Sequence, residues 1–430
     1  MNLILSPSGS DDTEAIQAAI NQVSASGGGI ISLNAGTYTV SPNSTTGYCL
    51  TMPSNIALGG SGMGATRIVL ATQTRLARLL RVNGSDCVIA SLTLHGGTQN
   101  DTSEHRHGLF LDGAKDFQAE RVRCEGFTGD GIYIYRNCLR ITLRDCVATG
   151  NNRNGVTMGA AAKDIHVAGG FFYGNRVTQI DSEPYAAEKV ENVRVIGASL
   201  DCTSGKGVAL TISGTEIAQG NGWSVVGNTV NGGIHQVRCN NVAIVGNHGT
   251  NATTKPFINL YLRGKRLAVV GNVAECTQDT ADWVPALDAG GSGTGDAPDQ
   301  ALFVGNAVKT ARPASNGIRG QGIISLVAVG NALEGPGIAK PYAGGIYLRT
   351  TNVNEDMRGT VAVANYVRNF GAYGVAYAGN LTAKHLAAVC TSNLLDDTAG
   401  SQTLAVKLDP SVQNFAGACT VCGNCKEVAK

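Results

Sequence analysis

Short apolar stretches recur along the chain, and many of them end in the same pair of residues. Two or three β-forming residues are followed by Gly-Asn in Val225–Asn228, Ile244–Asn247, Val269–Asn272, Phe303–Asn306 and Val327–Asn331. The interval between these repeats is roughly 20 to 35 residues, which is the range of solenoid coils. The pattern therefore predicts a stack of coils built from short strands.

A second short strand, which begins with Gly and an aliphatic residue, accompanies most coils. It occurs at Gly108-Leu109, Gly131-Ile132, Gly155-Val156, Gly207-Val208, Gly233-Ile234, Gly345-Ile346 and Gly374-Val375. Brief strands separated by Gly, Asn and Asp corners are typical of β-helix rungs, whereas propeller blades need longer strands and hairpin turns. We expect an all-β fold, a single-stranded right-handed parallel β-helix.

The start of the chain predicts a helical cap over residues 11–26. Asp11 and Glu14 have the spacing of a capping box. Apolar residues recur on one helical face at Ile16, Ala19, Ile20 and Val23. A helix here would cover the open end of the solenoid, whose strand edge is otherwise exposed. We expect one domain over residues 1–430, with its coils over residues 30–425.

Composition narrows the classes of partner. The chain has 15% charged residues and a formal net charge of +1, which argues against a disordered tail and against a polybasic nucleic-acid binder. We find no apolar run long enough to cross a bilayer, and residues 1–10 lack the features of a signal peptide. The twelve cysteines are spread along the chain, which favours buried thiols over a disulfide framework. We therefore expect neither nucleic acid nor membrane as a partner.

Two motif-like features have simpler interpretations. The glycine-rich segment 59–64 leads into a strand and not into a helix N-terminus, so it does not indicate a nucleotide site. Cys419, Cys422 and Cys425 have metal-like spacing, but Cys422 stands in the repeat phrase and no fourth ligand is near. We expect no cofactor and no metal here.

Three segments near the N-terminus, residues 11–20, 29–38 and 58–66, carry a resemblance to a known family. They resemble the opening of the pectate-lyase-like β-helix superfamily, which includes bacteriophage tailspike depolymerases. The resemblance implies a polysaccharide partner, a location outside the cell or on a virion, and a side-by-side homotrimer. It does not select a reaction, because the family includes lyases, hydrolases, epimerases and proteins without known activity.

Alignment of the coils on their Gly-aliphatic starts predicts two columns of outward side chains. One column contains Phe110, Tyr133, Thr157 and Asp181, and the next contains Asp112, Tyr135, Gly159 and Glu183. Successive members of a column would lie about 4.8 Å apart, the spacing of strands in a sheet. We expect an exposed aromatic surface at Tyr133 and Tyr135, next to the acids, on which sugar rings could stack.

Asp181 and Glu183 are the predicted catalytic pair. Two carboxylates on one strand face can span the separations of retaining and inverting glycosidases, so the spacing leaves both open. Segment 180–184 is also similar to an Asp-x-Glu-Pro strand of the superfamily. We expect glycoside hydrolysis with Glu183 as the acid and Asp181 as the base. The predicted substrate-binding residues are Tyr133, Tyr135, Asp112, Asp130, Arg136, Arg153, Thr157 and His235.

Two other functions stay open. A lyase or epimerase would need a base and a cation beside a uronate carboxylate. Candidates for these groups are Tyr133, Tyr135, Arg136, Arg153, His105, His107 and His235, although an exposed loop is the simpler expectation for His105 and His107. In a lyase, Asp130, Asp181 and Glu183 could instead hold calcium. A non-catalytic carbohydrate-binding solenoid would use the same surface, and the near-zero net charge favours hydrolysis over lyase chemistry.

Overall fold

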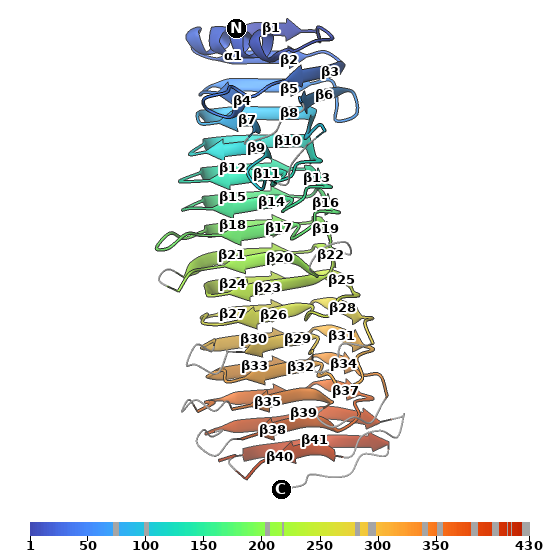
Figure 1. Cartoon of the computed structure of the whole chain (residues 1–430). Helices are drawn as coiled ribbons and strands as arrows, with labels where there is room; N and C mark the ends of the chain where they lie inside the picture. The colour runs from blue at the N-terminus through green and yellow to red at the C-terminus, as the bar shows by residue number, and fades with distance from the viewer. Residues whose placement is uncertain are drawn as a thin grey trace. The chain divides into compact units, whose positions relative to one another are not determined.

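The computed structural model divides into two compact units, Met1–Gly220 and Asn221–Lys430, each of which we describe by itself. It describes residues 1–71, 77–98, 103–202, 207–216, 219–279, 284–290, 298–337, 343–350, 356–379, 386–397, 404–410, 412–413 and 415–423. Each unit is a stack of short parallel strands, as Figure 1 shows by colour along the chain. The predicted parallel β-helix fold is confirmed, and the expectation of a single domain stays a prediction.

The first unit contains one helix and three runs of strands. Its elements are β1 Asn2–Leu5, α1 Thr13–Ala25, β2 Gly29–Leu33, β3 Gly36–Val40, β4 Tyr48–Met52, β5 Ile56–Gly60, β6 Thr66–Leu70, β7 Arg78–Val82, β8 Ser85–His95, β9 His107–Asp112, β10 Lys115–Glu125, β11 Ile132–Tyr135, β12 Leu139–Arg144, β13 Val147–Thr149, β14 Val156–Gly159, β15 Lys163–Ala168, β16 Phe171–Tyr173, β17 Ile180–Glu183, β18 Glu191–Ile196, β19 Ser199–Asp201 and β20 Val208–Ser213. Strands β4, β7, β9, β11, β14, β17 and β20 form one parallel sheet, which we call the site face.

The second unit repeats this organisation. Its strands are β21 Gly220–Val226, which begins at the last residue of the first unit, β22 Thr229–Asn231, β23 Gly233–Val237, β24 Cys239–Val245, β25 His248–Asn251, β26 Ile258–Tyr261, β27 Leu267–Val270, β28 Val273–Cys276, β29 Leu287–Gly290, β30 Gln300–Val304, β31 Ala307–Thr310, β32 Ile318–Gln321, β33 Ser325–Val329, β34 Ala332–Glu334, β35 Gly344–Arg349, β36 Thr360–Val363, β37 Tyr366–Arg368, β38 Tyr373–Ala378, β39 Ala388–Asp397, β40 Leu404–Leu408 and β41 Phe415–Gly423. Strands β23, β26, β29, β32, β35, β38 and β40 form the sheet that we call the second-unit face.

The helical cap is present, with two differences from the prediction. Helix α1 buries Ile16, Ala19, Ile20 and Val23 as expected. Its N-cap is Asp12, which makes no capping hydrogen bond, so the predicted capping box is wrong. Asp11 instead accepts hydrogen bonds from the backbone and hydroxyl of Thr13, and a strand that was not predicted, β1, precedes the helix and pairs with β2.

The Gly-Asn repeat builds a ladder of buried amides in the second unit. The ladder consists of Asn228, Asn247, Asn272, Asn306, Asn331, Asn365 and Asn393, all of which are at most 1% exposed. Each Nδ2 donates to the Oδ1 of the next asparagine at 2.8–3.0 Å, and that Oδ1 also accepts from the backbone of the previous one. The preceding residue has positive φ, as in Gly305 at 61°, which turns the asparagine inward. The repeat phrase thus supplies a self-paired polar spine.

Nine of the twelve cysteines are buried, and none of these nine forms a disulfide. Cys419 and Cys422 belong to β41, and Cys425 lies outside the described residues. No helix among the described residues is long and apolar enough to span a bilayer.

Candidate functional site

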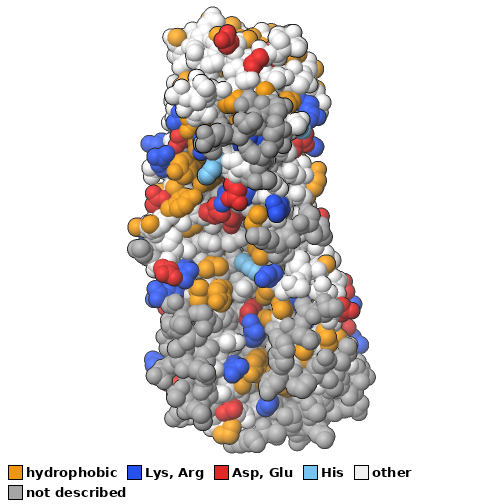
Figure 2. Space-filling model, in the orientation of Figure 1, with side chains coloured by type: hydrophobic (Ala, Val, Ile, Leu, Met, Phe, Trp, Pro, Cys, Tyr) orange, Lys and Arg blue, Asp and Glu red, His pale blue; other side chains and the backbone are white. Residues whose placement is uncertain are grey.

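The predicted stacking of the site face is confirmed by its strand register. Phe110, Tyr133, Thr157 and Asp181 are successive partners in β9, β11, β14 and β17. In the next column, Asp112 pairs with Tyr135, and Gly159 pairs with Glu183. Figure 2 shows charged side chains of both signs gathered among apolar ones on the displayed face.

The aromatic residues of this face pack against one another. Tyr133 is 8% exposed, so the prediction of an open aromatic surface is wrong at this residue, while Tyr135 is half-buried. The Tyr133 ring lies 5.7 Å from Phe110, 5.3 Å from Tyr135 and 4.9 Å from His107 between centroids. Side chains on coils about 4.8 Å apart bury one another, because large rings must share that narrow spacing.

His107 is the first residue of β9 and is 1% exposed, so its assignment to an exposed loop is wrong. The other histidine of that assignment, His105, is exposed as expected. The His107 Nδ1 lies 3.1 Å from the backbone nitrogen of Asp130 and 3.3 Å from its Oδ2. Its Nε2 is buried and has no hydrogen-bond partner among the described residues. Burial lowers the pKa of His107 despite the adjacent carboxylate, so the ring is neutral near pH 7.

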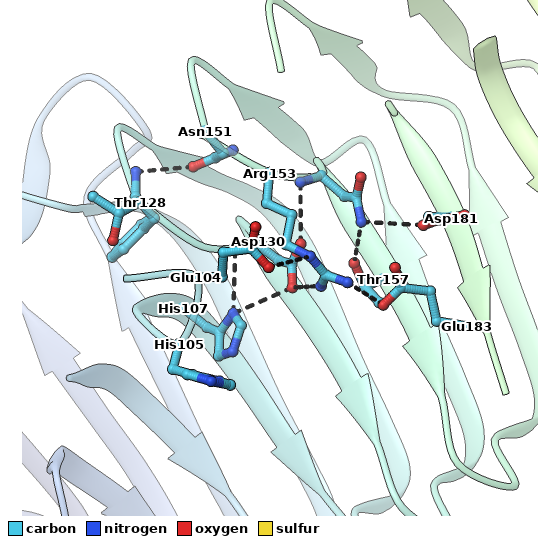
Figure 3. A network of polar contacts seen from close by, with 12 residues as sticks. Glu104, His105, His107, Thr128, Asp130, Asn151, Arg153, Thr157, Asp181 and Glu183 are labelled. Atoms are coloured by element: carbon cyan, nitrogen blue, oxygen red, sulfur yellow. Dashed lines mark hydrogen bonds and ion pairs between the residues drawn. The ribbon is translucent and has the colours of Figure 1, made fainter. Parts of the chain in front are cut away.

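Arg153 links the acids of three segments (Figure 3). Its Nη1 donates to Asp130 Oδ2 at 2.8 Å, its Nη2 donates to Glu183 Oε2, and its Nε lies 3.6 Å from the exposed Glu104. Burial would raise the pKa of Asp130, but hydrogen bonding to His107 and the positive charge of Arg153 hold it below the usual value. Two carboxylates likewise raise the pKa of Arg153 against the opposing effect of burial. This chain of charges holds the Glu183 side chain in position.

Asp181 behaves in the opposite way. Burial, the charge of Glu183 and a hydrogen bond with Glu183 raise its pKa well above the usual range. Its Oδ2 lies 3.2 Å from the Asn154 amide, and Asn154 also donates to Thr157 Oγ1 at 3.0 Å. Asp181 is therefore the member of the pair that keeps its proton, which favours it as the acid, whereas the sequence led us to expect it as the base.

The contact between the two carboxyl groups also bears on the reaction. Asp181 and Glu183 are within hydrogen-bonding reach of each other, whereas the carboxyl groups of glycosidases lie roughly 5 to 9.5 Å apart. The sequence predicted only the separation of their Cβ atoms, and the side chains turn toward each other. Their arrangement suits a shared proton better than two carboxylates on either side of a glycosidic bond.

The remaining predicted residues lie at the margin of this cluster or outside it. Asp112 accepts hydrogen bonds from Arg81 Nη2 at 2.7 Å and Nε at 3.1 Å, and it lies 3.8 Å from Arg136. The Arg136 guanidinium sits 4.9 Å from the Tyr135 ring centre. His235 belongs to β23 of the second unit, where burial lowers its pKa to about 4.

Three contributors escaped sequence reasoning. Tyr185, which is 54% exposed, is hydrogen-bonded to Tyr133, and burial followed by this contact raises the pKa of Tyr133, so its phenol stays protonated. Gly159 leaves the space that the Tyr133 hydroxyl uses, because a Cβ there would lie 3.2 Å from that oxygen. Asn154 is the third. Asp130 and Asn154 both precede the glycine that starts a strand, which was the available signal.

A calcium ion does not fit the residues proposed for it. The guanidinium of Arg153 already lies between Asp130 and Glu183, and Asp181 is protonated. Among the described residues, no group of three or more His, Cys, Asp or Glu side chains is placed to hold a metal ion. Calcium ligation would require loss of that arginine contact.

Comparison with curated proteins finds polysaccharide-modifying enzymes. Mannuronan C5-epimerase AlgE1 of Azotobacter vinelandii is 37% identical over 160 residues, which cover 34% of this chain and 11% of the epimerase. Alginate lyase 7 of the same organism is 32% identical over 159 residues, which cover 34% of this chain and 18% of the lyase. The chain thus matches less than a fifth of the length of either relative. No protein-family model matches the chain.

Solved structures share the fold. The A-module of Azotobacter vinelandii mannuronan C5-epimerase AlgE6 aligns with 93% of this chain and 96% of its own length, at a TM-score of 0.51 and 17% identity. The tailspike protein of E. coli bacteriophage HK620, solved with a pentasaccharide, aligns with 96% of this chain and 78% of its own length. Its TM-score is 0.53 and its sequence identity is 14%. Their common fold, the right-handed parallel β-helix, is also the fold of this chain.

Proposed function

We propose that this protein is an enzyme that modifies a uronate-containing polysaccharide by proton transfer at the carbon next to the uronate carboxylate. Epimerisation and elimination both begin with that step. The observation that carries the proposal is the position of Arg153, whose guanidinium contacts Asp130 and Glu183 beside the buried Asp181. The sequence similarity to mannuronan epimerases and an alginate lyase supports the same chemistry.

The first requirement is to reduce the charge of the substrate carboxylate, since a proton next to it is otherwise too weakly acidic. Asp181 is a neutral acid that can donate a hydrogen bond to this carboxylate, and Arg153 supplies a positive charge close by. Arg153 is 19% exposed at its side chain, so it can act through space while Asp130 and Glu183 hold it in position.

The second requirement is a base and an acid. Glu183 is the more exposed carboxylate, at 30% of its side chain, and we assign it as the base that accepts the C5 proton. Burial, the contact with Tyr185 and the charge of Glu183 keep the Tyr133 phenol protonated, so it can act as the acid only after Glu183 has taken the C5 proton. Return of a proton to C5 on the opposite ring face inverts the sugar. Donation to the departing O4 instead completes elimination and leaves a C4–C5 double bond.

Hydrolysis by Asp181 and Glu183 is the second candidate. A carboxyl group that keeps its proton beside a second carboxyl group resembles the pair that a glycosidase needs, which favours this reaction. The hydrogen bond between the two groups argues against it, because the carboxyl groups of glycosidases lie roughly 5 to 9.5 Å apart. A non-catalytic binding role is the third alternative.

One incubation separates these functions. The protein is mixed with mannuronan or polygalacturonate in D2O, and the products are examined by NMR, by ultraviolet absorbance of unsaturated uronate and by assay of reducing ends. Deuterium at C5 without chain cleavage would establish epimerisation, and absorbance with new reducing ends would establish elimination. New reducing ends without absorbance would indicate hydrolysis and contradict the proposal, and an unchanged polymer would indicate binding alone.

The proposal extends to location and assembly. A protein that acts on such polymers would work outside the cell or on a virion, and a homotrimer remains the expectation from the tailspike resemblance. Size-exclusion chromatography with light scattering tests the trimer directly.

A further inference from the structure

A hollow on the second-unit face has the chemistry of a second saccharide site. It has a volume of about 420 Å³, within the range of small-molecule pockets. Its lining includes Asn316, Arg319, Gln321, Tyr347, Arg349 and Lys407. All these residues belong to the second unit, whereas the proposed catalytic cluster belongs entirely to the first.

The strand register explains why a hollow forms there. Arg319 is the partner of Tyr347, which pairs with Ala376, which in turn pairs with Lys407. In the neighbouring column Arg349 pairs with Ala378. Ala378 lowers the surface of β38 between Arg349 on β35 and Lys407 on β40, and it lines the hollow. The strands on either side of β38 lie about two coil spacings of about 4.8 Å apart, which is wide enough to admit a sugar ring.

The cations of the hollow are held in different ways. Arg319 makes a two-point ion pair with the buried Asp288, Nε to Oδ1 at 2.9 Å and Nη2 to Oδ2 at 2.7 Å, so its guanidinium is fixed in place. Arg349 and Lys407 are exposed, and neither has a carboxylate partner within 4 Å in the described part of the chain. One cation that is held in place and two that have no carboxylate partner among the described residues together suit a ligand with a carboxylate.

The other groups of the hollow favour a sugar over a simple anion. Tyr347 is half-buried, and the buried Tyr373 ring supports it at 5.7 Å between centroids, which presents a braced aromatic surface. Asn316, Gln321 and Asp409 also line the hollow and can accept hydrogen bonds from hydroxyl groups. Asp409 adds negative charge, which disfavours a densely charged phosphate ligand.

We infer that this hollow is a second, non-catalytic binding site for one or two uronate residues of an acidic polysaccharide. The carboxylate would lie at Arg349 and Lys407, and a ring face would lie on Tyr347. The inference rests on the proposed function only in the choice of polymer, since the hollow takes no part in the chemistry. A second site would retain a long chain on the protein while the first unit acts on it.

The test is the number of sites for a short oligomannuronate, measured by isothermal titration calorimetry. The parent protein carries Asp181→Asn so that the oligomer is not consumed. The test variant adds Arg349→Ala and Lys407→Ala, and the matched control adds Lys309→Ala, which removes an exposed charge from a different strand run of the same unit. A neutral dextran oligomer controls for binding that does not need the carboxylate.

We expect two sites in the parent and in the Lys309→Ala control, and one site in the Arg349→Ala/Lys407→Ala variant. Affinity of long mannuronan should fall roughly tenfold in that variant at low salt, and by less at high salt, as expected for exposed charges. Equal numbers of sites in parent and test variant would overturn the inference. If the polymer assay shows no reaction but the double substitution still removes a site, the proposed function fails and the inference stands.

Discussion

The longest buried polar chains of the two units differ in charge, although the first unit also contains a short asparagine ladder from Asn151 to Asn175. In the second unit the asparagine ladder is uncharged, and each amide both donates to and accepts from the next. In the first unit the comparable buried chain runs through His107, Asp130 and Arg153 to Glu183, and it carries net charges with shifted pKa values. A neutral ladder stabilises the coils at any pH. A buried chain of charges shifts the pKa values of its members, which can prepare them for proton transfer.

The largest effect should follow from breaking the charged chain at its centre. Arg153→Met would leave Asp130 buried without its cation, which costs about 3–5 kcal/mol in the free energy of unfolding, and it would abolish turnover. Urea denaturation measures the loss. The control is Arg140→Met, which breaks the exposed pair with Asp116 and should change stability little. Equal losses in both variants would contradict a special role for the buried chain.

Breaking the neutral ladder should be the next largest effect. Asn306→Ala removes the acceptor for the Nδ2 and the backbone N–H of Asn272, which costs about 3 kcal/mol. Because no titrating group is involved, the loss should be the same at pH 5 and pH 8, as measured by urea denaturation. Asn221→Ala, which removes the acceptor of an exposed amide pair with Asn241, is the control and should be nearly neutral. A loss that varies with pH would show that the ladder is coupled to charges.

The next effect should come from Asp181→Asn, which replaces a protonated carboxyl group with a neutral amide of similar shape. It should reduce turnover without unfolding the protein. Asp181→Asn retains a hydrogen-bond donor toward Glu183, so turnover should fall about a hundredfold or more while the fold persists. The folded pKa of Asp181 is raised, so the wild type loses the stabilisation of the protonated form as pH rises above the unfolded value near 3.8. The unfolding free energy of the wild type should therefore fall relative to that of Asp181→Asn as the pH rises. A constant difference would show that Asp181 is ionised in the folded protein.

The smallest effect should come from the space beside Tyr133. Gly159→Ala would place a Cβ 3.2 Å from the Tyr133 hydroxyl, so the phenol must shift by a few tenths of an ångström. We expect a severalfold loss of turnover with less than about 1 kcal/mol of destabilisation, judged by steady-state kinetics and thermal unfolding. Gly64→Ala, where the added Cβ meets nothing within 4 Å, should leave both unchanged. Unaltered kinetics in Gly159→Ala would remove Tyr133 from the proposed mechanism.

Much of the coil arrangement could be predicted because a β-helix repeats local patterns. The columns through Tyr133, Thr157 and Asp181 follow from counting residues between Gly-aliphatic starts, since parallel strands stack in register. The core face of α1 was predicted for the same reason, whereas its N-cap was not, because Asp11 and Asp12 compete for one position. Strand β1 was missed, since four residues give too short a pattern.

The sequence named the residues of the candidate site, but not the protonation of their side chains or their contacts. Residue spacing placed Asp181 and Glu183 on one strand face, and Arg153 and Asp130 were named only as candidate binding residues. All four belong to one network. Spacing could not show that Arg153 neutralises Glu183 while burial protonates Asp181, because both depend on rotamers and on exclusion of water. The burial of His107 could not be predicted either, because it also depends on rotamers and on exclusion of water.

The sequence by itself determined the coil period, the inward aliphatic residues and the order of side chains along each column, because these depend only on alternation along a strand. Tertiary structure alone decided which polar groups of neighbouring coils touch, which carboxyl group keeps its proton, and where Ala378 on β38 opens a hollow. Those outcomes depend on desolvation and on contacts between side chains of different coils, and no local pattern encodes them.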